Sequence, residues 1–192
     1  MHNLPIRKDF RRLLNCPIFI DNDANLAGLS EAILIEKYDC VLYVTISTGI
    51  GTGIITRQEI DPQFADSEGG QILLEYKGKL QPWEDFAAGS AIVRRFGKRA
   101  DEIHDKKIWK VIAHDIAIGL YDLIAFIQPD AVVLGGGVLS NFAYLEEPLQ
   151  EELSKYETPL TVIPPILQAK YPEQAVAYGC YYFAKSAYAK SH

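Results

Sequence analysis

The run Asp21-Asn22-Asp23-Ala24-Asn25 follows a short apolar segment and precedes a helical pattern. A carboxylate at a strand-to-helix junction lies at the carboxyl edge of a sheet, where open α/β folds bind their ligands. Asp23 there could take a proton from a substrate hydroxyl. The alternative is structural, because Asn22 or Asp23 could cap the helix by accepting a hydrogen bond from a free N–H group. From these residues alone, both interpretations stay open.

The run Thr48-Gly49-Ile50-Gly51-Thr52-Gly53 has a glycine at every second position and hydroxyl side chains around them. Such glycines let main-chain N–H groups approach an anion closely, as phosphate-binding loops require. The alternative is a glycine-rich hairpin turn. The run is neither a Walker motif, since no Gly-Lys-Ser/Thr is present, nor a dinucleotide fingerprint, since a strand follows it.

Three consecutive glycines, Gly135-Gly136-Gly137, follow the apolar residues 131–134. Without side chains they would offer a flat surface to a nucleotide base or ribose. A helix N-terminus beside them would favour phosphate. The alternative is a flexible strand-to-helix turn.

Alternating strand and helix patterns must position these residues. Apolar β-rich runs predict strands at 17–21, 40–46, 53–56, 131–134 and 160–163. Helical spacing predicts helices after residue 25, from near 84, over 107–127, up to about 156 and over 173–189. The region 57–82 is polar and turn-rich and shows no clear pattern. The sequence therefore predicts an α/β sandwich with a mixed sheet and a hairpin at 40–56, built as one lobe over 1–192.

Composition excludes several classes of protein. With 192 residues, 48% of them hydrophobic, and a net charge of −6 without a basic block, direct binding to nucleic acid is not expected. No apolar run is long enough to span a bilayer, so no membrane association is expected either. The dispersed cysteines Cys16, Cys40 and Cys180 predict a cytoplasmic protein in which each is a small buried side chain.

Together these motifs resemble the ROK family of sugar kinases and repressors. Residues 18–31 resemble its catalytic segment, 48–53 its second phosphate motif and 132–138 its adenosine motif. The resemblance implies an α/β lobe of the actin-like ATPase (ribonuclease H-like) fold, in which two lobes enclose ATP and a hexose. It also implies that this chain is the C-terminal lobe alone, because the N-terminal lobe with the first phosphate motif is absent from these residues.

The resemblance also implies roles for individual residues. Asp23 would be the general base that deprotonates the attacking sugar hydroxyl, and Asn22 would bind the sugar. Glu68 and Glu84 match two sugar-binding glutamates, although a solvated loop residue and a helix-start charge are the bland alternatives. The nucleotide phosphates and adenosine would lie on Thr48, Gly49, Gly51, Gly53, Gly135, Gly136 and Gly137.

Two further departures from the family pattern bear on metals. Gln71 stands where the family has a histidine, which keeps hydrogen bonding but gives up a metal ligand. Residues 73–83 replace a cysteine-rich zinc loop and contain no Cys or His. Zinc is therefore not expected, and no residue of this chain is assigned to a metal.

The favoured hypothesis is a sugar kinase that transfers a phosphoryl group from ATP, with Mg²⁺, to a hexose or N-acetylhexosamine. The isolated chain is expected to be inactive, and a homodimer formed through this lobe is expected. One alternative is the sugar-sensing lobe of a ROK-type repressor, and another is a non-catalytic module for sugar binding or dimerisation.

Overall fold

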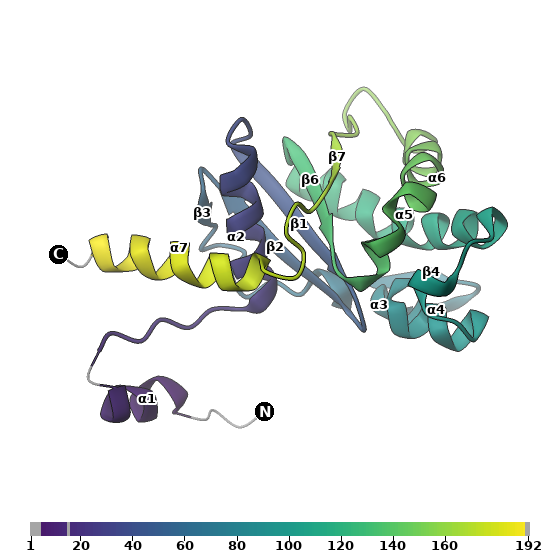
Figure 1. The fold of residues 1–192 in the computed structure, drawn as a ribbon. Helices are drawn as coiled ribbons and strands as arrows, with labels where there is room; N and C mark the ends of the chain where they lie inside the picture. Colours follow the sequence, from purple (N-terminus) through teal and green to yellow (C-terminus); the bar gives the residue numbers. More distant parts are fainter. Residues whose placement is uncertain (1–4, 15, 191–192) are drawn as a thin grey trace.

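The computed structural model describes residues 5–14 and 16–190. Its centre is a five-stranded mixed sheet in the order β3-β2-β1-β6-β7 (Figure 1). The strands are β1 (Cys40–Ile46), β2 (Ile50–Thr56), β3 (Glu59–Ile60), β6 (Ala131–Gly135) and β7 (Ile166–Gln168). The strand pairs β1–β2 and β2–β3 are antiparallel, whereas β1–β6 and β6–β7 are parallel.

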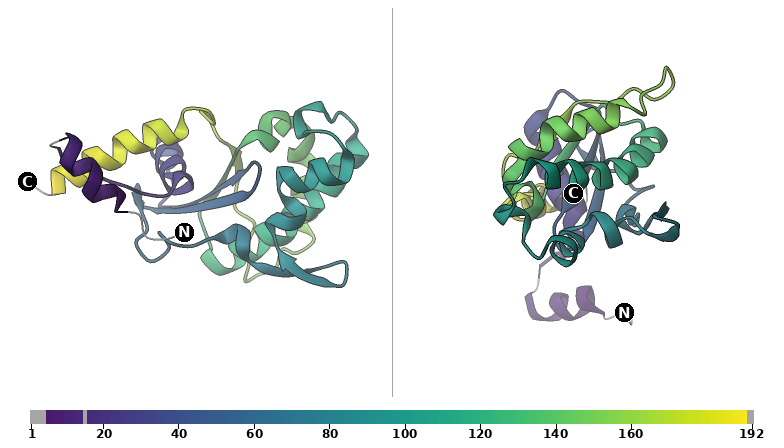
Figure 2. Two further views of the ribbon diagram at one scale, coloured as in Figure 1. Left: turned by 90° about the horizontal axis from the view of Figure 1, so that it is seen from below. Right: turned by 90° about the vertical axis from the view of Figure 1, so that its right-hand side faces the viewer.

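Helices cover both faces of the sheet, and Figures 1 and 2 show the two layers on either side of it. One layer contains α2 (Asp23–Ile35) and α7 (Ala175–Lys190), and the other contains α5 (Lys106–Ile127) and α6 (Phe142–Ser154). The shorter helices α3 (Glu84–Ala87) and α4 (Gly89–Phe96) adjoin the second layer. The helix α1 (Ile6–Leu14) contains no buried residue and stands apart from the sheet in Figure 1.

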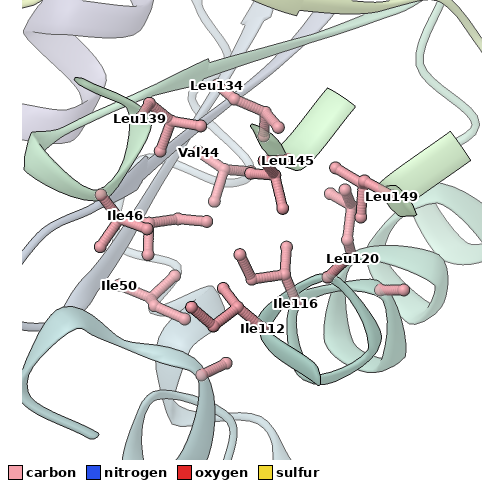
Figure 3. Close-up of a cluster of buried hydrophobic side chains, with 14 of the residues drawn as sticks. Val44, Ile46, Ile50, Ile112, Ile116, Leu120, Leu134, Leu139, Leu145 and Leu149 are labelled. Atoms are coloured by element: carbon pink, nitrogen blue, oxygen red, sulfur yellow. The ribbon is translucent and has the colours of Figure 1, made fainter. Parts of the chain in front are cut away.

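The alternation of side chains along β1 divides the core between these layers. Val41 and Tyr43 pack in the cluster below α2, whereas Leu42, Val44 and Ile46 pack in the larger cluster below α5 and α6. Successive side chains of a strand point to opposite faces of a sheet, so a largely apolar strand contributes to the core on both sides. Figure 3 shows Val44, Ile46 and Ile50 of the hairpin facing Ile112, Ile116 and Leu120 of α5.

The contact between α2 and α7 is close and partly polar. Gly179 of α7 lies directly on the main chain of Leu26, where no side chain would fit. Glu31 of α2 is 1% exposed, and its carboxylate accepts hydrogen bonds from the N–H groups of Lys170 (2.9 Å) and Tyr171 (3.0 Å). These hydrogen bonds satisfy the buried charge and fix the segment that enters α7.

A separate hairpin and three short helices complete the structure. The hairpin pairs β4 (Leu73–Tyr76) with β5 (Lys79–Pro82) and does not join the main sheet. The 3-10 helices are η1 (Gly69–Gln71), η2 (Ala100–Glu102) and η3 (Gly137–Asn141). The region 57–82, which shows no clear pattern in the sequence, thus contains three short strands and η1.

The prediction of an α/β fold with a mixed sheet and a hairpin at 40–56 is confirmed. The predicted strand 17–21 is wrong: its residues lie outside every strand, and Ile20 is 43% exposed. The strand predicted at 160–163 is also wrong, since Leu160 is 86% exposed and β7 begins only after Pro164-Pro165. Apolar composition favours extended backbone at both places, but a strand also needs a neighbour for its hydrogen bonds.

Two smaller expectations also need correction. The helix predicted from near residue 84 is two helices, because Ala88 adopts an extended conformation between α3 and α4. The cysteines are not buried: Cys16 and Cys180 are exposed, and Cys40 is half-buried at the start of β1. Cys16 lies between α1 and α2, Cys40 begins β1 and Cys180 lies on an outward face of α7, so chain position outweighs the usual preference of cysteine for the core.

Candidate active site

The first turn of α2 holds Asn22 and Asp23 at the edge of the sheet. Asn22 is the N-cap, and its Oδ1 accepts a hydrogen bond from the N–H of Ala24 at 2.8 Å. Asp23 is the first residue of the helix, and its Oδ1 accepts from the same N–H at 2.8 Å. The capping alternative therefore holds for Asn22. The Asp23 side chain is exposed, so its carboxylate is accessible to a ligand.

Two residues without a predicted role fix this turn. Asp21 Oδ1 accepts hydrogen bonds from the Asn22 N–H and from Asn25 Nδ2, each at 2.8 Å. The buried amide of Asn25 also donates to the Ala65 carbonyl oxygen at 2.8 Å. The start of α2 is thus tied to the segment that leads to Glu68. In the sequence, the polar residues Asp21 and Asn25 on either side of Asp23 are the feature that could have indicated these hydrogen bonds.

The alternating glycines explain how α2 comes so close to the hairpin. A Cβ atom placed on Gly53 would lie 2.7 Å from the Ala24 carbonyl oxygen, and one placed on Gly51 would lie 3.1 Å from the Ala24 Cβ. Both glycines belong to β2, so the alternative of a glycine-rich turn holds only for Gly49. Their lack of side chains lets the first turn of α2, with Asp23, lie directly on β2.

Glu84 and Gln71 meet at the turn of the same hairpin. Gln71 Nε2 donates to Glu84 Oε1 at 2.6 Å, and the N–H of Ile50 donates to Glu84 Oε2 at 3.1 Å. A Cβ atom on Gly49 would lie 2.7 Å from Glu84 Oε2. An extended chain rises about 3.4 Å per residue, so Gly49 and Gly51 are about 7 Å apart. Glu84, which lies against Gly49, and Ala24, which lies against Gly51, are therefore near neighbours on the same hairpin.

Glu68 lies at the margin of this group. It precedes η1, is exposed, and makes no capping hydrogen bond with its side chain. The next residue is anchored, because the N–H of Gly69 donates to Thr52 Oγ1 of β2 at 3.0 Å. The structure therefore brings Gln71 and Glu84 into contact and sets Glu68 just ahead of the 3-10 helix that carries Gln71.

A cavity of about 570 Å³ adjoins the same turn at Ser47 and Thr48. The N–H of Gly89, the first residue of α4, donates to the Ser47 carbonyl oxygen at 2.7 Å and fixes the wall between the turn and α4. The cavity is lined by Ser47, Thr48, Gly89, Ser90, Val93, Arg99, Ala100, Asp101, Gly137 and Val138. No sequence pattern indicates the lining residues of α4 and η2, which reach the cavity only through the fold.

The three consecutive glycines have different positions. Gly135 is buried beside the ring of Tyr43, and Gly136 adopts a φ of 91° against the backbone of Ile46. Gly137 has open space where a side chain would lie, and it lines the cavity. Only the last of the three thus presents a bare surface to a ligand.

Tyr43 lies in the core cluster beneath α2. Its side chain is 2% exposed between Gly28 of α2 and Gly135 of β6. Burial, followed by the charge of Glu31, raises the pKa of Tyr43 to about 12. The phenol is therefore neutral at physiological pH, and the sheet beneath Asp23 carries no charge at this position.

No described helix is both long and apolar enough to cross a bilayer. Within residues 5–14 and 16–190, no group of three or more His, Cys, Asp or Glu side chains is arranged to hold a metal ion.

Curated proteins similar to this chain include sugar kinases and a repressor. A putative fructokinase of Bacillus subtilis is 29% identical over 168 residues, covering 79% of this chain and 56% of that protein. The xylose repressor of the same organism is 23% identical, covering 79% of this chain and 46% of the repressor. The chain spans about half the length of the curated relatives it matches.

A solved structure extends the likeness to the fold. The ROK family glucokinase of Streptomyces griseus, solved with glucose and AMPPNP, superposes with a TM-score of 0.79 at 21% identity. The superposition covers 95% of this chain and 72% of the glucokinase, and the shared architecture is the actin-like ATPase fold. The ROK family model matches residues 1–187, and the chain belongs to the ROK family.

Proposed function

We propose that this chain forms part of a sugar kinase that transfers a phosphoryl group from ATP to a hydroxyl of a hexose or N-acetylhexosamine. One observation carries the proposal. The exposed carboxylate of Asp23 and the Glu84–Gln71 pair converge on the hairpin whose turn also lines a cavity of about 570 Å³. Phosphoryl transfer needs a hydroxyl and a phosphoryl donor held side by side, and this hairpin lies between two such places.

On the sugar side, hydrogen-bonding groups surround the acidic residue. Asp23 would accept the proton of the attacking hydroxyl as general base. Asn22, Glu68, Gln71 and Glu84 would orient the sugar through its other hydroxyls. Glu84 suits this role because Ile50 and Gln71 donate to its two oxygens and hold the carboxylate in one place. A held carboxylate binds a hydroxyl at less entropic cost than a free one.

On the donor side, the cavity has the volume of a nucleotide site, since ligand pockets range from about 300 to 1,000 Å³. Thr48 and Gly137 line it, and Gly49 follows Thr48 in the turn and lies against Glu84. We assign nucleotide contacts to Thr48, Gly49 and Gly137. The packing of Gly51, Gly53, Gly135 and Gly136 supports a structural role for these four.

Mg²⁺ would neutralise charge on the phosphates during transfer. We assign no described residue to that ion. The step carried by this chain is the removal of the hydroxyl proton by Asp23. It occurs while Glu84 and Gln71 keep the sugar in place.

The relatives' greater length supports a further part of the proposal. Residues 1–192 would form the C-terminal lobe, and a first lobe with another phosphate motif would complete the site. The isolated chain should then fold without phosphorylating sugar. A homodimer through this lobe and a cytoplasmic location remain part of the same proposal.

The xylose repressor among the relatives favours one second candidate, a sugar-sensing lobe that binds sugar without turnover. In that case a DNA-binding helix-turn-helix would precede the first lobe. The sequence encoded upstream distinguishes the two candidates directly.

A panel of hexoses and N-acetylhexosamines, tested with ATP, GTP and polyphosphate on the full-length protein, is the direct test. The expected result is phosphorylation of at least one sugar. Sugar binding without turnover across the panel would contradict the kinase proposal and favour the sensing lobe.

A further inference from the structure

The β4–β5 hairpin separates the two residues that meet at the candidate sugar site. Gln71 precedes β4 and Glu84 follows β5, so the pair closes the base of the hairpin. The N–H of Trp83 donates to the Ile72 carbonyl oxygen at 2.9 Å at the same base. The position of Glu84 therefore depends on where this hairpin lies.

The hairpin has no sheet to hold it. Its two strands pair only with each other, and Leu73 and Leu80 are 59% and 64% exposed. A two-stranded hairpin is marginally stable by itself in water. Something outside the hairpin must fix its position.

Tyr76 at the end of β4 provides one anchor. Its ring stacks on Phe86 of α3, with the ring centroids 4.2 Å apart and an angle of 5° between the planes. Its hydroxyl accepts a hydrogen bond from Nη2 of Arg95 in α4. The other terminal nitrogen of Arg95, Nη1, donates to the carboxylate of Asp115 in α5.

Asp115 is the point on which both ends of the hairpin converge. It is 2% exposed, and its carboxylate pairs with Arg95 while its main-chain carbonyl oxygen accepts from Trp83 Nε1 at 3.2 Å. Trp83 is fully buried and directly precedes Glu84. Burial raises the pKa of the Asp115 carboxyl, and the hydrogen bonds from Tyr76 and Arg95 oppose that rise.

We propose that Tyr76, Arg95 and Asp115 are positioning residues that hold the β4–β5 hairpin on α5 and thereby fix Glu84 against the turn of the main hairpin. We call these three residues the clamp. The clamp itself is an inference about position, and its effect on a sugar substrate rests on the proposed function. Asp115 Oδ1 is buried without a hydrogen-bond partner among the described residues, so the carboxylate depends on its pairing with Arg95. A buried polar network with one unsatisfied atom is sensitive to the loss of any further member.

The arrangement supports positioning rather than simple bulk packing. A buried ion pair gives little net stability, because removing two charges from water offsets their attraction. Hydrophobic side chains could fill the same space between α4 and α5. Leu74 and Tyr76 also pack against the main core, but these apolar contacts are not directional. The clamp adds directional hydrogen bonds that connect α5 to both ends of the hairpin.

The test measures the position of Glu84 without relying on activity. The Ile50 N–H donates to Glu84 Oε2, so its hydrogen exchange, followed by NMR, reports that contact. Arg95→Met should accelerate this exchange about tenfold relative to the amide of Val44 in the core, because a charge-assisted hydrogen bond is lost. Tyr76→Phe, which keeps the ring stack, should accelerate it about threefold. Arg95→Lys should give an intermediate rate.

Glu31→Gln is the matched control. It alters a carboxylate that is equally buried but lies in the other helix layer, where it binds the N–H groups of Lys170 and Tyr171. The control should leave the ratio of Ile50 to Val44 exchange unchanged. In the full-length protein, Tyr76→Phe should raise the sugar KM severalfold and leave kcat unchanged, as expected when uniform binding is weakened.

A ratio of Ile50 to Val44 exchange within twofold of the unsubstituted protein in Tyr76→Phe and Arg95→Met would overturn the inference. If Arg95→Met does not fold, Tyr76→Phe alone decides. Exchange that rises as expected in a protein that phosphorylates no sugar would uphold the clamp and refute the proposed function.

Discussion

Replacing Asp23 by Asn separates catalysis from helix capping at one position. Asn22, not Asp23, is the N-cap, and the amide oxygen of the substituted side chain could still accept from the Ala24 N–H. The only loss for the helix is a negative charge near its N-terminus, about 0.3–1 kcal/mol of stability. A general base contributes about 10²–10⁴-fold to kcat, which corresponds to about 2.7–5.5 kcal/mol of barrier.

The expected result in the full-length protein is therefore a kcat lowered by about 10²–10⁴-fold, with little change in sugar affinity. A coupled kinase assay measures kcat and KM, and urea unfolding measures stability. Asp85→Asn is the matched control, because Asp85 is also an exposed carboxylate in the first turn of a helix. It should lose similar stability and keep its kcat.

A kcat within about threefold of the unsubstituted protein would leave Asp23 without a catalytic role. A loss of stability well above about 1 kcal/mol would refute the assignment of the cap to Asn22.

Three further predictions concern the fold. Gly53→Ala should lower the free energy of unfolding by about 1–3 kcal/mol in urea, because its Cβ would press on the Ala24 carbonyl oxygen. Gly137→Ala, with open space at that position, should be nearly neutral. Equal losses of stability in the two variants would contradict this packing. The raised pKa of Tyr43 means that the folded state resists its deprotonation, so the stability it contributes is complete below pH 10 and is lost as pH rises toward 12. Between about pH 9 and 11.5 the protein should lose about 2 kcal/mol more than Tyr43→Phe, and parallel urea curves would refute this. Adding EDTA should leave Tm unchanged, because Gln71 stands where the family has a histidine that could bind zinc. Removal of a structural zinc ion would be easily detected, since such an ion contributes about 10 kcal/mol to stability. Stoichiometric zinc in the purified protein would contradict this prediction.

The sequence predicts best where pattern and environment agree. The bounds of β1 follow from seven residues, Cys40–Ile46, that suit a strand buried on both faces. The start of α2 follows from the polar run at 21–25. The order of the motifs identifies the family because each motif is local in the chain.

The remainder depends on contacts between distant residues. The turn Lys77-Gly78, with φ of 53° and 77°, is a local signal for the β4–β5 hairpin. The strands are short, however, and the position of the hairpin depends on contacts with distant residues, among them Arg95 and Asp115. The glycine at every second position suggests phosphate binding by itself, and the structure adds that Gly51 and Gly53 let α2 lie close to β2. The contact of these glycines with α2 can be recognised only once the positions of α2 and β2 are known.

The close packing of α2 against α7 affects the position of Asp23. Helix α2 has 13 residues, is about 20 Å long and resists bending. It carries Asp23 at one end. It contacts α7 at Gly179, and Glu31 binds the segment that enters α7. The first turn of α2 is held on β2 at Gly51 and Gly53, so α2 connects α7 to the hairpin. A tilt of only a few degrees over that length displaces the carboxylate by about 1 Å, enough to break its reach to a hydroxyl. In the proposed kinase, the place of the Asp23 carboxylate would therefore depend on how α7 packs against α2.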